Sequence, residues 1–394
     1  MTNRAVFLLS LAAFASAASL RATDTLLPQL AAEFSVTTGT AASVVTAFAI
    51  SYGLLQAIYG PLGDRYGKYL MVCATTLASA LGTFACAVAP TLDTLILARF
   101  AAGATVGALI PLSMAWIGDV VAYEQRQALI ARFLLGQILG TAFGQSVAGV
   151  LAEQFGWRAI FVVLAVLYLI VGTLLLLELR SNPITRRSAN DATVTIRAGL
   201  ARMAGLLAHP WVRSVVGIVF LEGMLMFGSI AFIPVHLQHR FSLGPAAAGA
   251  MVSAYAVGGV LYALSAKRFV AGLGEPGLAA GGGLVLAAGY LWLAFASAAW
   301  ASVPGILLIG VGFYMLHNTL QVNATQMAPA ARGSAVSLFA LCLFTGQSVG
   351  VWLAGKVVDA YGTVPVFMAA ALGLALLGYR FRRQLQIQAR SARA

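Results

Sequence analysis

Four charged side chains stand inside long apolar stretches of this sequence, and they are the residues most able to do chemistry. They are Arg21, Asp24, Arg99 and Glu222, and their formal charges sum to zero. A lone charge in hydrocarbon is costly, so such residues usually pair, face a cavity and carry function. Two carboxylates beside two guanidinium groups are suited to binding and releasing a proton.

Asp24 is the residue that we expect to accept the proton. Arg21 lies three positions before it, on the same face of a helix. Arg99 would lie at a similar depth on an antiparallel helix, within reach of Asp24. A nearby arginine would keep Asp24 ionised until substrate binding or closure displaced it, and desolvation would then favour protonation. Glu222 is the second candidate, and the alternative is two static ion pairs that only make helix packing tolerable.

A substrate-binding wall is expected from polar residues that are dense between positions 311 and 326 and from flexible or aromatic residues elsewhere. The expected lining residues are Tyr314, His317, Asn318, Gln321, Met226, Phe227 and Tyr255. Three of the polar ones share a helix face at i, i+4 and i+7, and the histidine titrates near neutral pH and could relay protons. Methionine and aromatic walls suit varied lipophilic ligands. Ordinary packing is the alternative for all of them.

The elements that must hold these residues are membrane-spanning helices. Sixty per cent of the 394 residues are apolar and 9% are charged, more apolar than a soluble core requires. At least ten windows of about twenty residues carry little or no charge, the length that crosses about 30 Å of hydrocarbon. Transmembrane strands would alternate in polarity, and these runs do not. We therefore predict an all-α polytopic membrane protein.

No catalytic or metal-binding pattern accompanies the spans. Cys73, Cys86 and Cys342 lie in apolar runs without metal-ligand or disulfide spacing. We expect no enzyme activity, no metal and no cofactor. The small residues at 15–17 resemble a signal-peptide cleavage site, but a first span that continues to residue 30 leaves an even number of spans.

Twelve spans are predicted, six on either side of a polar segment at 180–209. They cover 5–30, 39–62, 69–89, 92–118, 128–151, 157–179, 211–236, 244–265, 277–297, 302–326, 333–356 and 362–380. Nineteen of the 24 Lys and Arg residues then fall at the termini or in loops on the same side, which places both termini in the cytoplasm. Topology thus accounts for the basic charge, and no nucleic-acid binding is expected. Residues 195–208 indicate an amphipathic helix on the cytoplasmic surface.

The two sets of six spans resemble one another. A shift of 206 residues superposes three glycines of span 5 on three of span 11: Gly140, Gly144 and Gly149 on Gly346, Gly350 and Gly355. Equivalent halves of equal orientation are parallel repeats, an architecture of secondary transporters. The expected units are an N-terminal six-helix bundle at 1–180, a linker at 181–209 and a C-terminal six-helix bundle at 210–394, the bundles being related by pseudo-two-fold symmetry.

The segment 60–68, Gly-Pro-Leu-Gly-Asp-Arg-Tyr-Gly-Lys, gathers charge and glycine between two apolar runs. It resembles the signature loop between spans 2 and 3 of the major facilitator superfamily. Leu97-Ala98-Arg99-Phe100 resembles the span 4 arginine motif of that family, and Thr23-Asp24-Thr25-Leu26-Leu27-Pro28 is similar to the twelve-span drug:proton antiporters. The antiporters' span 5 motif ends in Gly-Pro, whereas Gly144 is followed here by Gln145. The resemblance covers nearly the whole chain and implies the major facilitator fold.

The resemblance also implies roles for particular residues. Spans 1, 4, 7 and 10 line the central cavity in this superfamily, and the four buried charges fall on three of them. The loop would act as a gate, with Asp64 capping the helix start near Gly333-Ser334 and Arg65 paired with Asp119. The gating residues implied are Gly60, Asp64, Arg65, Gly67, Lys68 and Asp119; the alternative is that these charges only anchor loops in water. The glycines of spans 5 and 11 would form a smooth, rocking contact with the opposite half, or ordinary tight packing.

These observations predict a secondary active transporter that moves a small organic molecule by alternating access. Proton-coupled efflux by antiport is the leading interpretation, and proton-coupled uptake of a small, anionic metabolite is the alternative. A non-transporting receptor or scaffold is disfavoured by the intact intramembrane charges and gate loop. The expected partners are the small-molecule substrate, protons and the lipid bilayer, for a functional monomer in a bacterial cytoplasmic (inner) membrane.

Overall fold

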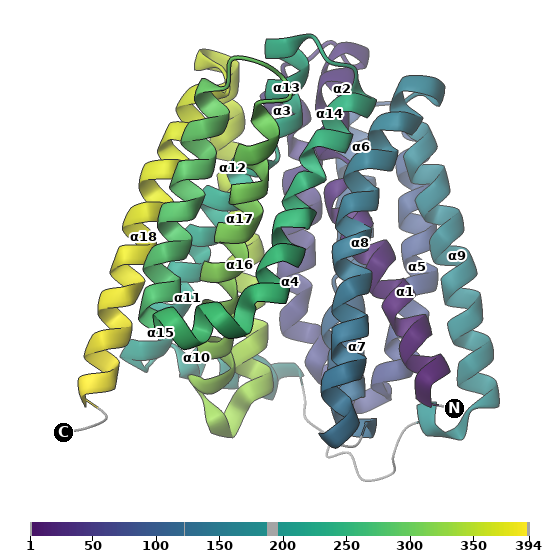
Figure 1. Cartoon of the computed structure of the whole chain (residues 1–394). Coiled ribbons are helices and arrows are strands. Elements are labelled where there is room, and N and C mark those ends of the chain that lie inside the picture. Colours follow the sequence, from purple (N-terminus) through teal and green to yellow (C-terminus); the bar gives the residue numbers. More distant parts are fainter. Residues whose placement is uncertain (1, 122, 187–195, 392–394) are drawn as a thin grey trace.

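Helices make up the regular structure of the chain throughout the part that is described, residues 2–121, 123–186 and 196–391. The computed structural model has no strand in those ranges, which confirms the predicted all-α class. Both termini lie at the same end of the molecule, at the bottom of Figure 1. We call this the terminal end, and the opposite one the distal end.

The helices of each half follow the predicted spans, with extra breaks. In the first half they are α1 (Thr2–Arg21), η1 (Asp24–Leu26), α2 (Leu27–Glu33), α3 (Thr38–Ala41), α4 (Ser43–Tyr66), α5 (Lys68–Ala87), α6 (Leu92–Val106), α7 (Leu109–Val120), α8 (Tyr123–Phe155), α9 (Arg158–Ser181) and η2 (Pro183–Thr185). After the linker helix α10 (Ile196–Leu206) come α11 (Pro210–Glu222), η3 (Gly223–Phe227), α12 (Gly228–Ile230), α13 (Ile233–Phe241), α14 (Pro245–Val252), α15 (Ala254–Phe295), α16 (Ser302–Gln326), η4 (Pro329–Ala331), α17 (Arg332–Tyr361) and α18 (Val364–Ser391).

Joined across their small breaks, the described helices give eleven candidate membrane spans by length and composition. One of them, Pro245–Phe295, has 51 residues, about 76 Å of helix against about 30 Å of hydrocarbon. It contains Gly274 at φ 60° and ψ 176°, a conformation that no helix interior has. This segment therefore forms two crossings, and the twelve predicted spans are accounted for.

The glycines of spans 5 and 11 reveal the internal repeat in three dimensions. A Cβ added to Gly140 would lie 2.2 Å from the carbonyl oxygen of Phe14, and one added to Gly346 would lie 2.1 Å from that of Phe220. Gly350 approaches the Met224 carbonyl in the same way. Both the glycines and their partners differ by 206 positions, so the register found in the sequence is also the packing register.

The structure corrects the expectation that these glycines all meet the opposite half. Gly140 and Gly144 of α8 pack on α1, and Gly346 and Gly350 of α17 pack on α11 and η3, so each set contacts its own half. The remaining pair, Gly149 and Gly355, does reach across, to Pro245 and Gly39. The reason is helical periodicity, because five residues beyond Gly144 the helix presents a face about 140° away.

A Gly350→Val substitution tests this close packing. The added side chain has no space against the Met224 carbonyl, 2.0 Å from the ideal Cβ position, so we expect a loss of about 1–3 kcal/mol in stability. The measurement is thermal unfolding of the purified protein in detergent. Gly217→Ala is the matched control, since nothing lies within 4 Å of its added Cβ. Equal melting temperatures for the two variants would contradict the assignment.

Spans 1 and 7 are each interrupted before a proline, and each has an irregular turn beside a buried carboxylate. Pro28 and Pro234, again 206 apart, lack the N–H that a continuous helix needs and clash with the carbonyl four residues earlier. Asp24 opens the short 3₁₀ turn η1 before Pro28, and Glu222 directly precedes the π-helical turn η3. Irregular turns of this kind inside membrane helices occur mainly at functional sites.

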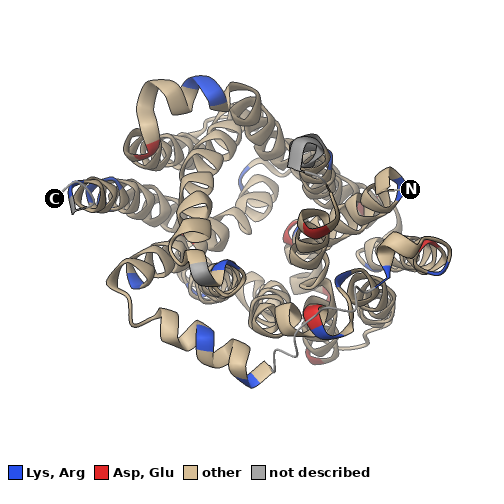
Figure 2. Cartoon of the chain, turned by 90° about the horizontal axis from the view of Figure 1, so that it is seen from below, with Lys and Arg blue, Asp and Glu red and all other residues tan. Residues whose placement is uncertain are grey.

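The buried apolar residues form two main clusters, one drawn mostly from positions 5–175 and one from 215–385. Helix α10 falls within the predicted amphipathic segment, with Met203 and Leu206 buried and Leu200 exposed. It lies across the terminal end, where Gly199 packs against Pro61 of α4. Figure 2, seen from that end, shows α10 at the edge of the helix assembly and few charged residues along the helices.

Candidate functional site

Asp24 lies fully buried at the break in span 1. Its side chain has 0% exposure, and Oδ2 accepts a hydrogen bond from Nη1 of Arg21 at 3.3 Å. The other oxygen, Oδ1, has no hydrogen-bond partner among the described residues. A buried carboxylate that is satisfied on one oxygen only is costly when ionised and has a free position for a proton.

Arg21 links this carboxylate to the second half of the molecule. Its guanidinium carbon lies 4.5 Å from the ring centroid of Phe227, a cation–π contact between the halves. A single cation thus contacts the acid of one half and an aromatic ring of the other.

Glu222 is the second buried acid, and it lies in the second half. Its side chain has 0% exposure, and Oε2 lies 2.9 Å from Nδ1 of His317. Oε1, like Oδ1 of Asp24, has no hydrogen-bond partner in the described part of the chain. The sequence predicted each residue separately, and the structure joins span 7 to span 10 through this pair.

An aromatic bridge connects the two acids. The His317 ring stacks on Phe313 with centroids 4.7 Å apart, and Phe313 meets Phe227 edge-on at 5.3 Å. Phe227 is the ring beneath Arg21, so the series Asp24, Arg21, Phe227, Phe313, His317 and Glu222 is continuous. Phe313 was not expected from the sequence, because a phenylalanine in an apolar span gives no signal of its own.

The other predicted lining residues divide between this cluster and its surroundings. Tyr255 and Tyr314 belong to it, with centroids 6.2 Å apart and Phe313 next to both. Asn318 is half-buried and Gln321 is exposed on the same helix. Met226 does not face the cluster as expected: it is fully buried inside the second half, where its carbonyl accepts a hydrogen bond from the Tyr290 hydroxyl. Met226 and Phe227 are consecutive in the π-helical turn, so their side chains point in different directions.

The contacts of Arg99 differ from the expected pairing with Asp24. Among the described residues it makes no ion pair with Asp24; its Nε and Nη2 donate to the carbonyls of Val44 and Ser19 at 3.4 and 3.3 Å. The guanidinium also lies 3.9 Å from the ring centroid of Phe48. Arg99 therefore ties spans 1, 2 and 4 together within the first half.

The charged segment 60–68 also has partners other than those expected. Helix α4 continues to Tyr66, and the chain turns only at Gly67, whose φ is 98°. Asp119 is bound by Nζ of Lys68 at 2.5 Å, not by Arg65. The turn brings the start of α5, where Lys68 lies, next to the end of α7, where Asp119 lies. Asp64 also contacts Lys68, at 3.5 Å.

The other residues of this segment that were expected to gate have separate surroundings and share no contact partner in the ranges that the structure describes. The Arg65 guanidinium lies over the ring of Tyr66. Gly60 has open space around it, with nothing within 4 Å of an added Cβ. At Gly333, the expected cap site of Asp64, an added Cβ would likewise meet nothing within 4 Å. The described contacts of Asp64 therefore stay within the first half.

Two buried glutamines were missed by sequence reasoning. Gln145 and Gln347 each have 0% exposure, and both polar atoms of each side chain lack a hydrogen-bond partner in the described ranges. The Gln145 carbonyl accepts a hydrogen bond from Thr25, the residue after Asp24, and Gln347 lies against Gly223, the residue after Glu222. The signal was present, since an amide inside an apolar span is itself unusual.

The sequence resembles one known family over most of its length. Residues 9–351 match the sequence model of the Major Facilitator Superfamily. The uncharacterized MFS-type transporter YceJ of Bacillus subtilis (strain 168) is 28% identical over 365 residues, which cover 90% of this chain and 90% of that protein. The Multidrug resistance protein B homolog of Mycobacterium tuberculosis (strain CDC 1551 / Oshkosh) is 26% identical over 82% of this chain and 70% of that protein.

A solved structure has the same fold. The nucleoside transporter NupG superposes with a TM-score of 0.77, covering 98% of this chain and 99% of that chain, at 16% sequence identity. At this identity the likeness concerns the fold alone.

Proposed function

Because this chain belongs to the major facilitator superfamily of small-molecule transporters, we propose that it exports small organic molecules in exchange for protons, by alternating access. The observation that carries the proposal is the pair of fully buried carboxylates, Asp24 and Glu222, one in each half and each with an unpartnered oxygen. Arg21 and the aromatic bridge connect them across the contact between the halves.

The coupling step follows from competition for Arg21. While Asp24 is ionised, Arg21 is its counter-ion and lies against Phe227 of the other half. A proton on the free oxygen of Asp24 removes the charge that holds Arg21, and the contact between the halves weakens. Substrate that binds among Tyr255, Tyr314 and His317 would act on the same cation. Proton and substrate therefore favour different arrangements of the halves, as coupling requires.

Export is supported by the multidrug resistance homologue among the relatives. The aromatic side chains of the cluster suit lipophilic ligands. Uptake of an anionic metabolite is the second candidate, and Arg21 favours it, because a guanidinium against an apolar ring is a receptor for a carboxylate once Asp24 is protonated.

The direct test uses the purified protein in liposomes that contain a pH-sensitive dye, and a strain that overexpresses the protein. Export by antiport predicts proton flux when a substrate is added and higher resistance to at least one member of a broad panel of lipophilic compounds. Unchanged resistance to the whole panel, together with proton flux driven by organic anions, would replace export by uptake. Absence of proton flux with any transported compound would contradict coupling.

We further propose that the segment 60–68 gates the terminal end, which is the cytoplasmic side of a bacterial inner membrane, and that the monomer is the working unit. The basic residues grouped at this end support the orientation. Asp64→Asn is expected to insert normally and to lower the transport rate about tenfold, because it removes a charge next to Lys68. Transport at the full rate by an Asp64→Asn protein that reaches the membrane in normal amounts would argue against a gating role.

A further inference from the structure

Two carboxylates at the distal end cap helices of the opposite half. Asp359, at the end of α17, accepts hydrogen bonds from the backbone N–H of Gly39 at 2.7 Å and from the Thr37 hydroxyl at 2.6 Å. Glu153, at the end of α8, accepts one from the backbone N–H of Ala246 at 3.0 Å. In each case an acid of one half satisfies the first turn of a helix in the other.

The two contacts are equivalent under the internal repeat. Glu153 and Asp359 differ by 206 positions, and the capped residues Gly39 and Ala246 differ by 207, the shift that also relates 34–36 to 241–243. A cap placed once by chance would not recur at the symmetry-related position. The recurrence indicates that both halves keep a carboxylate here for the contact between them.

Close approach of the backbones makes each cap possible. A Cβ added to Gly39 would lie 2.2 Å from the Gly355 carbonyl oxygen, and one added to Gly149 would lie 2.2 Å from the Pro245 carbonyl oxygen. Gly149 and Gly355 each lie one turn before the carboxylate on the same helix. Without side chains at these points, α8 and α17 approach the other half closely enough for a carboxylate to reach a backbone N–H.

The helix starts need an external acceptor. At α14 the N-cap residue is Gly244, which has no side chain to accept the free N–H groups, so Glu153 supplies the missing acceptor. At α3 Thr37 accepts only the N–H of Thr40, and Asp359 takes that of Gly39. A negative charge at a helix N-terminus also interacts favourably with the helix dipole.

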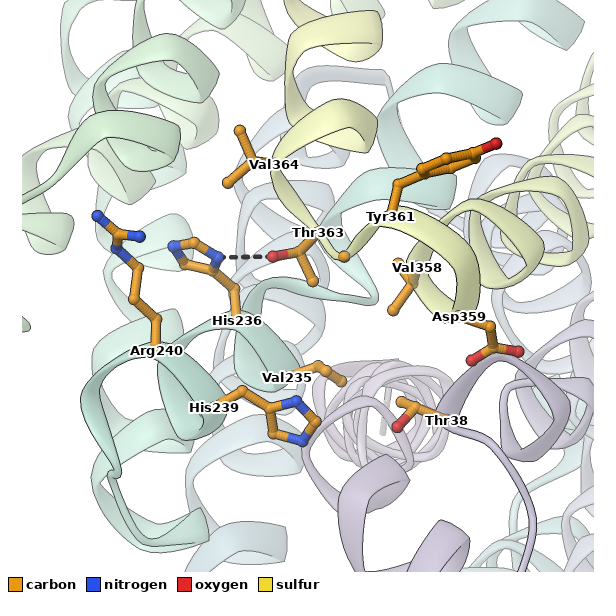
Figure 3. A pocket seen from close by; sticks show the side chains of 11 residues that line it. Thr38, Val235, His236, His239, Arg240, Val358, Asp359, Tyr361, Thr363 and Val364 are labelled. Carbon is orange, nitrogen blue, oxygen red and sulfur yellow. Dashed lines mark hydrogen bonds between the residues drawn. The ribbon is translucent and has the colours of Figure 1, made fainter.

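Figure 3 shows Asp359 beside Thr38 of the other half, at the border of a cavity of about 490 Å³ that His236, His239 and Arg240 also line. Both carboxylates are exposed to solvent. Water therefore screens the two contacts, and each contributes modestly. Contacts of this strength can form and break in every transport cycle.

We infer that Glu153 and Asp359 are paired positioning residues of the transport cycle: each holds the opposite half while the distal end is closed, and both contacts must break for that end to open. This inference rests on the proposed alternating-access function. It assigns the closed distal state to two symmetric contacts, separate from the Asp24 and Glu222 cluster that couples protons.

The test measures the distance between the halves directly. Cys73, Cys86 and Cys342 are replaced by alanine, and spin labels are attached at Asp93→Cys and Ser297→Cys, two exposed positions at the distal end of opposite halves. Pulsed electron resonance on the protein in lipid nanodiscs then gives the populations of short and long distances. No substrate is needed, so failure of the proposed export function would leave this result interpretable.

Glu153→Gln and Asp359→Asn are each expected to shift the ratio of closed to open populations about fivefold toward open, the usual effect of losing a helix cap. The double variant is expected to shift it about twentyfold, since both contacts act on one equilibrium. Thr37→Val removes one of the hydrogen bonds to Asp359 and should give a smaller shift in the same direction, even if a charge variant folds poorly.

The matched control is Glu33→Gln. Glu33 is also an acid at the distal end, but it binds Arg158 and Trp157 of its own half, so its loss should leave the distance distribution unchanged. An unchanged distribution in the double variant would overturn the inference. A shift in Glu33→Gln as large as in Asp359→Asn would overturn it as well, because the effect would then be general loosening of this end.

Discussion

Asp24→Asn is expected to abolish proton-driven transport, with a fall in rate of about a hundredfold or more, the usual loss when a proton-transfer group is removed. Asparagine keeps the volume and one hydrogen-bond acceptor for Arg21 but cannot take up a proton. Arg21 would then lack a counter-ion permanently, as if Asp24 were always protonated. The measurement is substrate flux in proteoliposomes driven by an imposed pH gradient.

Substrate exchange without a pH gradient separates coupling from folding in this variant. Because exchange needs no net proton movement, Asp24→Asn is expected to retain it while losing the pH-driven flux. Asp93→Asn is the matched control, an exposed acid of the same half that contacts none of the central residues, and it should behave like the unmodified protein. If pH-driven flux persisted in Asp24→Asn, the proton would have to bind elsewhere.

Glu222→Gln is expected to reduce pH-driven transport about tenfold or more, and to do so through His317. The substitution preserves size but removes the negative charge that lies 2.9 Å from the histidine ring nitrogen. An imidazolium at that position would lose its counter-ion. The readout is the pH dependence of the flux in proteoliposomes, compared with that of His317→Gln and of the double variant.

A double-mutant cycle decides whether Glu222 and His317 act as one unit. If they share a proton, the double variant should be no slower than either single one, because the first substitution already removes the function. Glu275→Gln is the control on the same half, where the acid contacts Asn323 near the terminal end. Strictly multiplicative effects of the two substitutions would contradict a shared proton site and leave Glu222 as a packing partner.

The architecture could be read from the sequence because its causes are local. A membrane span needs about twenty apolar residues wherever it lies in the chain, and the structure has helices at every predicted span. The shift of 206 residues was visible in the spacing of glycines and is repeated in their packing partners. Family membership followed from the segment 60–68 and is confirmed by the match over residues 9–351.

Pairings between side chains were harder to predict, because the direction of a side chain depends on the exact path of its helix. Arg65 and Lys68 are equally suitable partners for Asp119 in composition, and the turn at Gly67 decides for Lys68. Arg99 has the right depth to reach Asp24, yet its guanidinium binds the carbonyls of Val44 and Ser19. The depth of a residue in the membrane follows from its position along the span. The direction of its side chain also depends on every kink in the helix that carries it.

The sequence by itself determined which residues could carry chemistry, since four charges in apolar spans need a reason wherever they point. Only the tertiary structure decided which of them meet. The π-helical turn after Glu222 sets the direction of Phe227, which lies beneath Arg21, and the packing of span 7 against span 10 brings Glu222 to His317. The physical reason is that burial acts on each residue separately, while an ion pair or a helix cap requires two chain segments to arrive at one place with matching directions.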